Sequence, residues 1–140
     1  MSVLNWVLLG FASWTILVLL TGVGLVRWSK ILTGRARLNE FPADVPHGSV
    51  RYRRAMRAHA NCVENLPVLG AVVVAANAAG AQGGLIDRLA VLYLVARVLQ
   101  TITHVAFEET SLAVGVRFSF FFTQIACVVW MGVLVARAAG

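Results

Sequence analysis

Long apolar stretches alternate with shorter polar ones along this chain. Residues 3–26 carry no charged side chain, and a second uncharged stretch runs from Asn65 to Ile86. A third apolar stretch, 89–107, contains a few polar residues, and a fourth, 118–136, contains no charge. About 20 apolar residues in a helix suffice to cross the hydrocarbon core of a bilayer. The pattern therefore predicts four transmembrane helices, at about residues 3–27, 50–80, 86–107 and 116–137.

The one long polar segment, residues 28–49, lies between the first two predicted helices. It holds two glycines and two prolines, residue types that break helices. The other connections are short, so consecutive helices must run in opposite directions. We therefore predict an all-α fold, with a single domain over residues 1–140 that forms a four-helix bundle embedded in a membrane.

Composition agrees with a membrane environment. Hydrophobic residues make up 59% of the chain, charged residues make up 13%, and the mean hydropathy is +0.80. Soluble domains contain about 25% charged residues. One core of this size could not hide so much apolar surface, so lipid must cover part of it.

Positive charge is concentrated at one end of the predicted bundle. The formal net charge is +6, and eight of the twelve Lys and Arg residues lie between Arg27 and Arg57, around the polar loop. The four spans leave no room for a soluble module, so we expect no nucleic-acid partner. Cations beside apolar spans instead follow the positive-inside rule. The sequence predicts a multi-pass integral membrane protein, with the 28–49 loop in the cytoplasm.

Two of the predicted helices carry polar side chains on one face. The second helix has them at i, i+4 and i+7, as Arg57, Asn61 and Glu64. The third helix repeats this spacing with Arg97, Gln100 or Thr101, and His104. A charge at membrane depth costs at least about 2.5–3.5 kcal/mol, so such residues face the bundle interior or a water-filled cavity.

These two polar faces allow two interpretations. Glu64 and Arg97 could neutralise each other and lock the bundle, or the polar groups together could form a pocket for a polar ligand. More polar groups are present than one ion pair needs, which favours the pocket, and a buried pair adds little net stability. An excess of arginine suits an anionic ligand with carboxylates. The three histidines are scattered without ligand spacing, so we expect no metal site.

The segment 54–67 resembles the second-helix signature of the MAPEG superfamily, the membrane-associated proteins of eicosanoid and glutathione metabolism. The matching residues are Arg54, Arg57-Ala58, Asn61 and Glu64-Asn65. Further similarities lie in the basic segment 33–38, which contains Arg37, in Ala96-Arg97 with Thr101 and His104, and in Arg117. The resemblance covers nearly the whole chain and is to a bacterial-type member, which implies a bacterial inner membrane as the location.

This resemblance implies a homotrimer that binds glutathione between neighbouring subunits as a co-substrate. The glutathione thiolate would attack a lipophilic electrophile or a lipid hydroperoxide drawn from the membrane lipid. Arg117 would be the catalytic residue that stabilises the thiolate. The residues implied to hold glutathione are Arg37, Arg57, Asn61, Glu64, Arg97, Gln100 and His104.

The sequence departs from the family pattern at four positions. Ala60 stands where some members have an arginine, and Gln100 replaces a common histidine. His104 stands where tyrosine is frequent, and Phe121 where related synthases carry a tyrosine hydroxyl. These changes bear on which electrophile the protein accepts and on its affinity for glutathione.

Two alternative functions stay open at the level of sequence. The chain could be a small membrane transporter that exchanges protons at Glu64, since intramembrane carboxylates mark such pathways. It could also be a catalytically inactive family member that packs against another membrane protein. Glutathione binding would distinguish the glutathione-dependent enzyme from the transporter. Turnover would distinguish that enzyme from the inactive family member.

Overall fold

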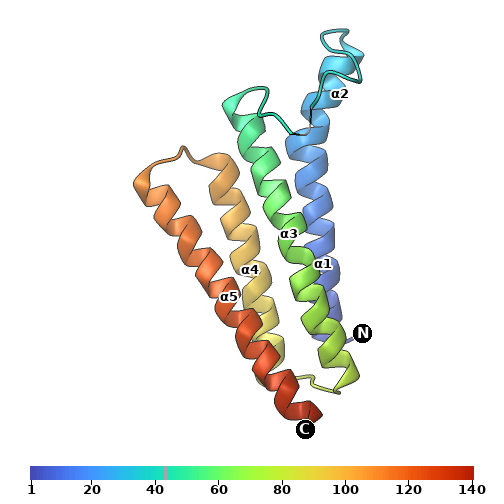
Figure 1. Ribbon diagram of the computed structural model, residues 1–140, viewed down its shortest axis with the longest axis vertical. Helices are drawn as coiled ribbons and strands as arrows, with labels where there is room; N and C mark the ends of the chain where they lie inside the picture. Colours follow the sequence, from blue (N-terminus) through green and yellow to red (C-terminus); the bar gives the residue numbers. More distant parts are fainter. Residues whose placement is uncertain (43) are drawn as a thin grey trace.

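Four long helical segments run side by side in the computed structural model, which describes residues 1–42 and 44–140 (Figure 1). Each segment is long and apolar enough to cross a membrane. Within the described ranges no strand occurs. The predicted all-α, four-span membrane bundle is therefore confirmed.

The first segment is one continuous rod made of three parts. Helix α1 (Val3–Val18) passes into a π-helix, η1 (Leu19–Gly24), and then into α2 (Leu25–Leu32). The rod continues beyond residue 27, where the sequence placed its end. Gly34 has a φ of 69°, a conformation that favours glycine and commonly follows the last turn of a helix.

The second and third segments are α3 (Val50–Ala78) and α4 (Gly84–Ala106). Ser49 caps α3, because its hydroxyl accepts a hydrogen bond from the backbone N–H of Tyr52. Pro67 lies inside α3 without ending it.

The fourth segment, α5 (Ser111–Ala139), begins five residues before the expected position of 116. The Thr110 hydroxyl accepts a hydrogen bond from the backbone N–H of Ala113 and so caps the helix at this earlier point.

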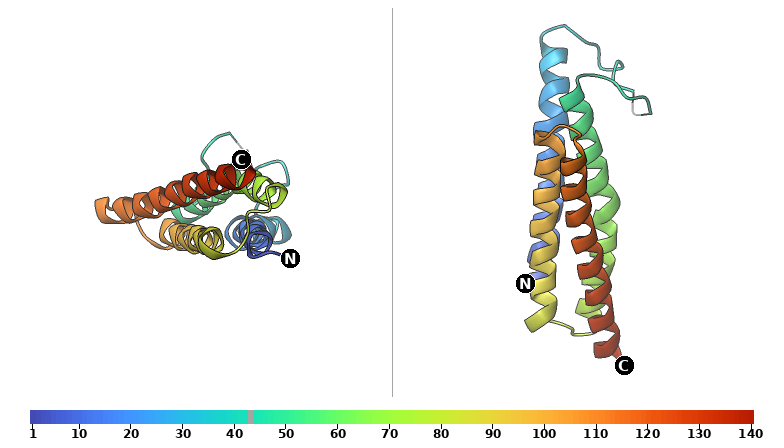
Figure 2. Two further views of the ribbon diagram at one scale, coloured as in Figure 1. Left: turned by 90° about the horizontal axis from the view of Figure 1, so that it is seen from below. Right: turned by 90° about the vertical axis from the view of Figure 1, so that its left-hand side faces the viewer.

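The four segments pack as an antiparallel bundle. In the end-on view of Figure 2, α1 lies beside α3 and α4, and α5 closes the bundle on the far side. Both chain termini lie at one end, and the loop after α2 and the α4–α5 connection lie at the other (Figure 1). We refer to these as the terminal end and the loop end. The side of the membrane that the loop end faces stays a prediction.

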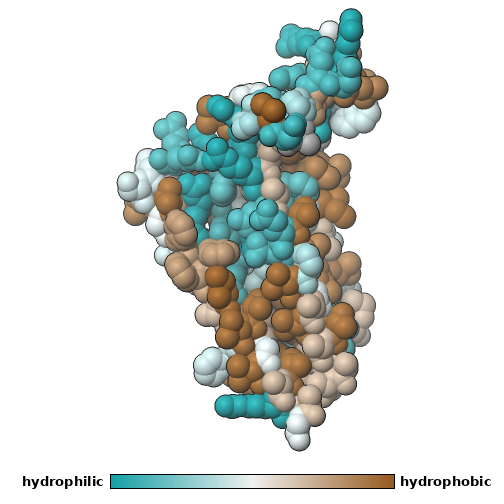
Figure 3. Space-filling model, viewed as in Figure 1, coloured by the Kyte–Doolittle hydropathy of each residue, from teal (hydrophilic) through white to brown (hydrophobic). Residues whose placement is uncertain are grey.

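The apolar core fills the half of the bundle near the terminal end. It contains Leu4 and Phe11 of α1, Leu69 in the second half of α3, Tyr93 in the first half of α4, and Met131 in the second half of α5. The polar residues gather instead in the loop half, and Figure 3 shows a hydrophilic surface there above an apolar one. Apolar packing thus dominates toward the terminal end, and in the loop half a smaller apolar cluster of Val23, Tyr52 and Ala55 lies beside the polar residues.

The outer surface of the spans is apolar. Between 22% and 33% of the most hydrophobic window of each span is buried inside the bundle, and the rest is partly or fully exposed. Aromatic and aliphatic side chains such as Trp6, Leu20, Phe122 and Trp130 are among the exposed ones. In water such a surface would drive association, whereas lipid solvates it directly.

Candidate functional site

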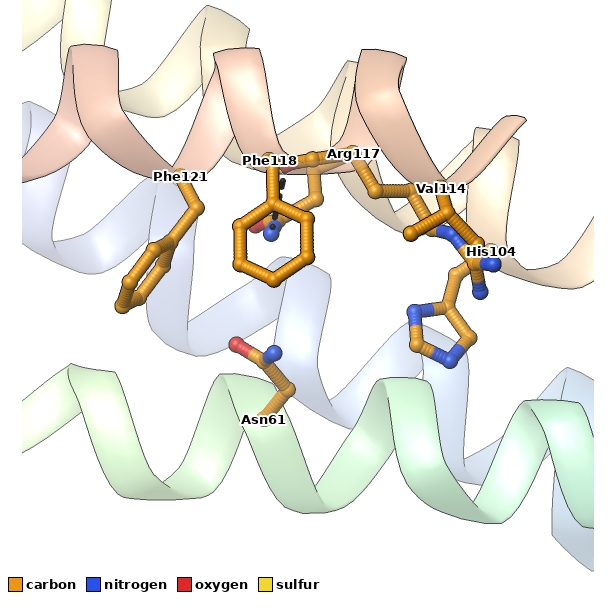
Figure 4. Close-up of a pocket in the computed structure, with 7 residues that line it drawn as sticks. Asn61, His104, Val114, Arg117, Phe118 and Phe121 are labelled. Atoms are coloured by element: carbon orange, nitrogen blue, oxygen red, sulfur yellow. Dashed lines mark hydrogen bonds between the residues drawn. The ribbon is translucent and has the colours of Figure 1, made fainter. Parts of the chain in front are cut away.

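A hollow of about 270 Å³ opens in the loop half of the bundle, between α3, α4 and α5. The loop end of α5 leans away from α3, as Figure 1 shows. The side chains that line the hollow, drawn in Figure 4, are Asn61, Gln100, His104, Val114, Arg117, Phe118 and Phe121.

Asn61 projects from α3 into the hollow, and two hydrogen bonds to its side-chain oxygen fix the orientation of its amide. Arg97 Nη1 and Asn65 Nδ2 both donate to Asn61 Oδ1, the latter at 3.1 Å. A guanidinium group has donors and no acceptor, so the atom of Asn61 that faces it must be the oxygen. The amide nitrogen then points the other way, and among the described residues it has no acceptor. Asn61 therefore offers a hydrogen-bond donor to whatever fills the hollow.

Arg97 is the buried cation behind Asn61. Its side chain is 1% exposed, and its guanidinium carbon lies 5.4 Å from the centroid of the Phe11 ring, a cation–π contact. Within the described part of the chain, its Nε and Nη2 atoms have no hydrogen-bond partner. A cation so placed is costly at membrane depth, and its positive potential reaches the hollow through Asn61.

Gln100 connects α4 to α5, because both the oxygen and the nitrogen of its side-chain amide form hydrogen bonds to α5. Gln124 Nε2 donates to Gln100 Oε1 at 3.0 Å, and Gln100 Nε2 donates to the carbonyl oxygen of Arg117 at 3.3 Å. Both glutamines are almost fully buried. Gln100 thus forms the floor of the hollow and holds the start of α5 in place, with little hydrogen-bonding capacity left over.

Arg117 and His104 provide the polar groups of the upper wall. Arg117 is half-buried, its Nε donates to the Ala113 carbonyl oxygen at 3.4 Å, and its guanidinium extends along the hollow (Figure 4). The Nε2 atom of His104 is buried, and no described residue pairs with it. Both side chains can therefore bind a ligand.

The hollow is positively charged and half apolar. Arg117 lines it, Arg97 stands behind it, and no acidic side chain among the described residues lines it. Val114, Phe118 and Phe121 form an apolar wall on the same face of α5 as Arg117, across the hollow from Asn61 (Figure 4), and Phe118 is 55% exposed to the surroundings of the bundle. Such a site can hold an anionic group against the cations while an apolar molecule contacts the aromatic wall.

Three of the residues predicted for the site lie elsewhere in the described chain. Arg57 pairs with Glu109 at 2.8 Å, near the α4–α5 connection, where both side chains are half exposed or more. Arg37 is exposed in the loop after α2. Glu64 is exposed on α3, one turn from Asn61. None of the three lines the hollow, and their role in binding stays a prediction.

The ion pair considered between Glu64 and Arg97 does not form in the described chain. Arg97 turns into the bundle, where it meets Asn61 and Phe11, whereas Glu64 points outward. Glu64 and Asn61 share one face of α3 by spacing, but α3 and α4 are rotated so that Arg97 hydrogen-bonds to Asn61. The polar faces therefore meet, as expected, through an amide rather than a carboxylate.

Sequence reasoning missed the apolar wall. Val114 and Phe118 carry no chemical signal by themselves, and both lie in an apolar helix. Their spacing from Arg117 and Phe121 could have indicated them, since positions 114, 117, 118 and 121 share one helical face.

Residues 6–137 match the MAPEG family, which is nearly the full length of the chain. A search among curated proteins gave no match. The family match covers all four spans and every residue that lines the hollow. The chain belongs to the MAPEG family.

Proposed function

We propose that this protein is a glutathione-dependent membrane transferase or peroxidase that acts on lipophilic electrophiles. Family membership supports a membrane function in glutathione or eicosanoid chemistry. The observation that carries the finer proposal is the hollow itself, where Arg117 lies beside an aromatic wall on α5 and the donor face of Asn61 lies across from it. Glutathione is anionic and its partner is lipophilic, so the two kinds of surface suit the two reactants.

Arg117 is the proposed catalytic residue. A thiol has a pKa of about 8.5 and is mostly protonated at neutral pH, and a nearby cation shifts it toward the reactive thiolate. The Arg117 guanidinium stabilises that thiolate. Asn61 donates its amide N–H to an anionic group of glutathione, and Arg97 adds positive potential from behind.

The chemistry then follows one of two routes. With an electrophilic carbon, the thiolate sulfur forms the new C–S bond and the leaving group departs with its bonding electron pair. With a lipid hydroperoxide, the sulfur attacks the terminal oxygen, the O–O bond breaks, and the alkoxide takes a proton to become an alcohol. A second glutathione then reduces the resulting sulfenic acid, giving a disulfide and water.

A second copy of the chain completes the proposed site. The hollow measures about 270 Å³, at or below the roughly 300–1,000 Å³ of most ligand pockets. Glu64 is exposed within a membrane span, where a carboxylate needs a polar partner. A homotrimer would bring a neighbour's surface, including Arg37 or Arg57, over the hollow and Glu64, with glutathione held between copies.

The test is a glutathione titration of the purified protein in detergent, followed by ultraviolet absorbance of the thiolate and by turnover of a halogenated aromatic acceptor. Replacing Arg117 with alanine should lower turnover by about 10²–10³-fold, the usual effect of removing one donor to a developing anion. Arg137→Ala is the matched control, since it removes the same charge from the far end of α5 and should leave turnover unchanged. Absence of both the thiolate signal and turnover in the native protein would refute the proposal.

The structure gives less support to transport through Glu64. A proton-coupled carboxylate should lie in a cavity that crosses the bundle, whereas Glu64 lies on an outward face and lines none of the hollows found in residues 1–42 and 44–140. Proteoliposome flux that is lost in Glu64→Gln, without glutathione binding, would favour the transporter instead.

A further inference from the structure

A long groove lies between η1, α3 and α4, away from the proposed glutathione site. It consists of two adjoining hollows, of about 310 Å³ and 220 Å³, which share Thr21, Gly22 and Val105. No residue of the groove lines the hollow around Arg117. The groove is therefore a separate feature, and the proposed reaction does not account for it.

The two ends of the groove differ in polarity. The hollow nearer the loop end is lined by Ser49, Arg51 and Tyr52, whereas the deeper hollow is lined by Trp14 and Ile102 among others. No acidic side chain lines either hollow within the described residues. The groove thus runs from a cationic mouth to an apolar interior.

A second arginine strengthens the positive charge of the mouth. Arg27 Nε donates to the hydroxyl oxygen of Tyr52 at 2.6 Å, and the Arg27 guanidinium carbon lies 5.3 Å from the centroid of the Phe41 ring. These contacts hold Arg27 beside the mouth, while the exposed Arg51 is free to turn toward a bound group. An anion at the mouth would thus meet Arg51 directly, and Arg27, which lines neither hollow, adds its positive charge from its place beside Tyr52.

The interior of the groove is apolar even where threonines line it. The Thr21 hydroxyl donates to the Leu17 carbonyl oxygen at 2.7 Å, and the Thr101 hydroxyl donates to the Arg97 carbonyl oxygen at 2.9 Å. Each hydroxyl is therefore satisfied by its own helix. Gly22 has no side chain, and its backbone packs closely against α3 at the floor of the groove. A Cβ at this position would lie 2.9 Å from the Ala55 Cβ.

The length of the groove matches one leaflet of a bilayer. Its residues on the first rod extend from Trp14 to Val26, which at 1.5 Å per residue is roughly 18 Å along the helix axis. Half of the hydrocarbon core of a bilayer is about 15 Å thick. A lipid chain that lies in the groove would thus keep its headgroup at the membrane surface.

We propose that this groove binds an anionic phospholipid of the surrounding bilayer. The phosphate lies at Arg51 and Arg27, and one acyl chain runs past Val105 to Trp14. Charge complementarity at the mouth selects an anionic over a zwitterionic headgroup, and the exposed walls at Thr21 and Ile102 let the chain enter sideways from the membrane. This proposal stands independently of the glutathione reaction.

Trp14 allows a direct test. In a Trp6→Phe, Trp28→Phe, Trp130→Phe background the remaining indole fluoresces from the apolar end of the groove. Phosphatidylglycerol brominated on its acyl chains should quench this fluorescence at mole fractions several-fold lower than phosphatidylcholine brominated in the same way. Arg51→Gln should remove that difference.

The matched control is Arg53→Gln, on the same turn of α3 but lining a different hollow. It should retain the preference for phosphatidylglycerol. Equal quenching by the two lipids in the background that retains only Trp14, with Arg51 unchanged, would overturn the proposal, as would a preference that Arg51→Gln leaves intact. Because fluorescence is independent of turnover, failure here is distinguishable from failure of the proposed catalytic function.

Discussion

Replacing Asn61 with aspartate separates the binding role of this residue from its structural one. The carboxylate is nearly the same size as the amide, and it still accepts a hydrogen bond from Arg97, now as one member of an ion pair. The buried guanidinium therefore gains a counter-charge. Toward the hollow, however, the N–H donor is replaced by an oxygen that carries negative charge.

The expected effect on binding follows from the lost contact. A hydrogen bond to a charged group contributes about 1.5–3 kcal/mol, so its loss weakens binding of an anionic ligand by roughly 10–150-fold, before repulsion is counted. Thermal stability should be equal to or above that of the native protein, because the uncompensated Arg97 becomes paired. Asn61→Leu should lose both binding and stability, since it leaves that cation without its acceptor.

Isothermal titration with glutathione and thermal unfolding in detergent measure the two quantities on the same samples. Asn77→Asp is the control, because it adds the same charge to the terminal end of α3, where Asn77 contacts Asn5 rather than the hollow. Binding by Asn61→Asp within threefold of the native value would refute the assigned amide orientation. So would a stable Asn61→Leu variant that binds glutathione normally.

Three further substitutions test the packing around the site by thermal unfolding in detergent. Gln124→Leu leaves the buried Oε1 of Gln100 without its donor and should cost about 1–3 kcal/mol, so an unchanged midpoint would contradict this link between helices. Gly22→Val forces a Cβ to within 2.9 Å of the Ala55 Cβ and should cost about 1–3 kcal/mol through overpacking, whereas Gly132→Val, in open space, should cost less. Arg57→Gln breaks an exposed ion pair and should change stability by less than about 1 kcal/mol; a larger loss would mean that the pair is shielded from water.

The helix ends show where sequence patterns lose precision. Hydropathy measures the apolar part of a helix, so it placed the end of the first span near residue 27 and the start of the last near residue 116. The polar turns beyond these points are decided by capping and by backbone conformation. Thr110 caps α5 and Gly34 follows the last turn of α2, and neither changes the hydropathy profile.

In the candidate site, too, the sequence predicted which residues are polar but not which of them contact each other. Helical spacing placed Asn61 and Arg97 on polar faces, and family resemblance added Arg117. The sequence could not show that Arg97 contacts Asn61 rather than Glu64, because that depends on the rotation of α3 against α4. It could not show that Gln100 is engaged by Gln124, because that contact depends on the axial register of α4 and α5.

By itself, the sequence determined the membrane fold and the set of polar groups that must be kept from lipid, because the cost of exposing charge to hydrocarbon is large and local to each helix. The tertiary structure decided which of those groups meet. Contacts between helices depend on rotation, register and the close approach allowed by residues such as Gly22, none of which hydropathy records. The Arg97–Asn61 contact, the apolar wall at Phe118 and the groove that ends at Trp14 all come from packing alone.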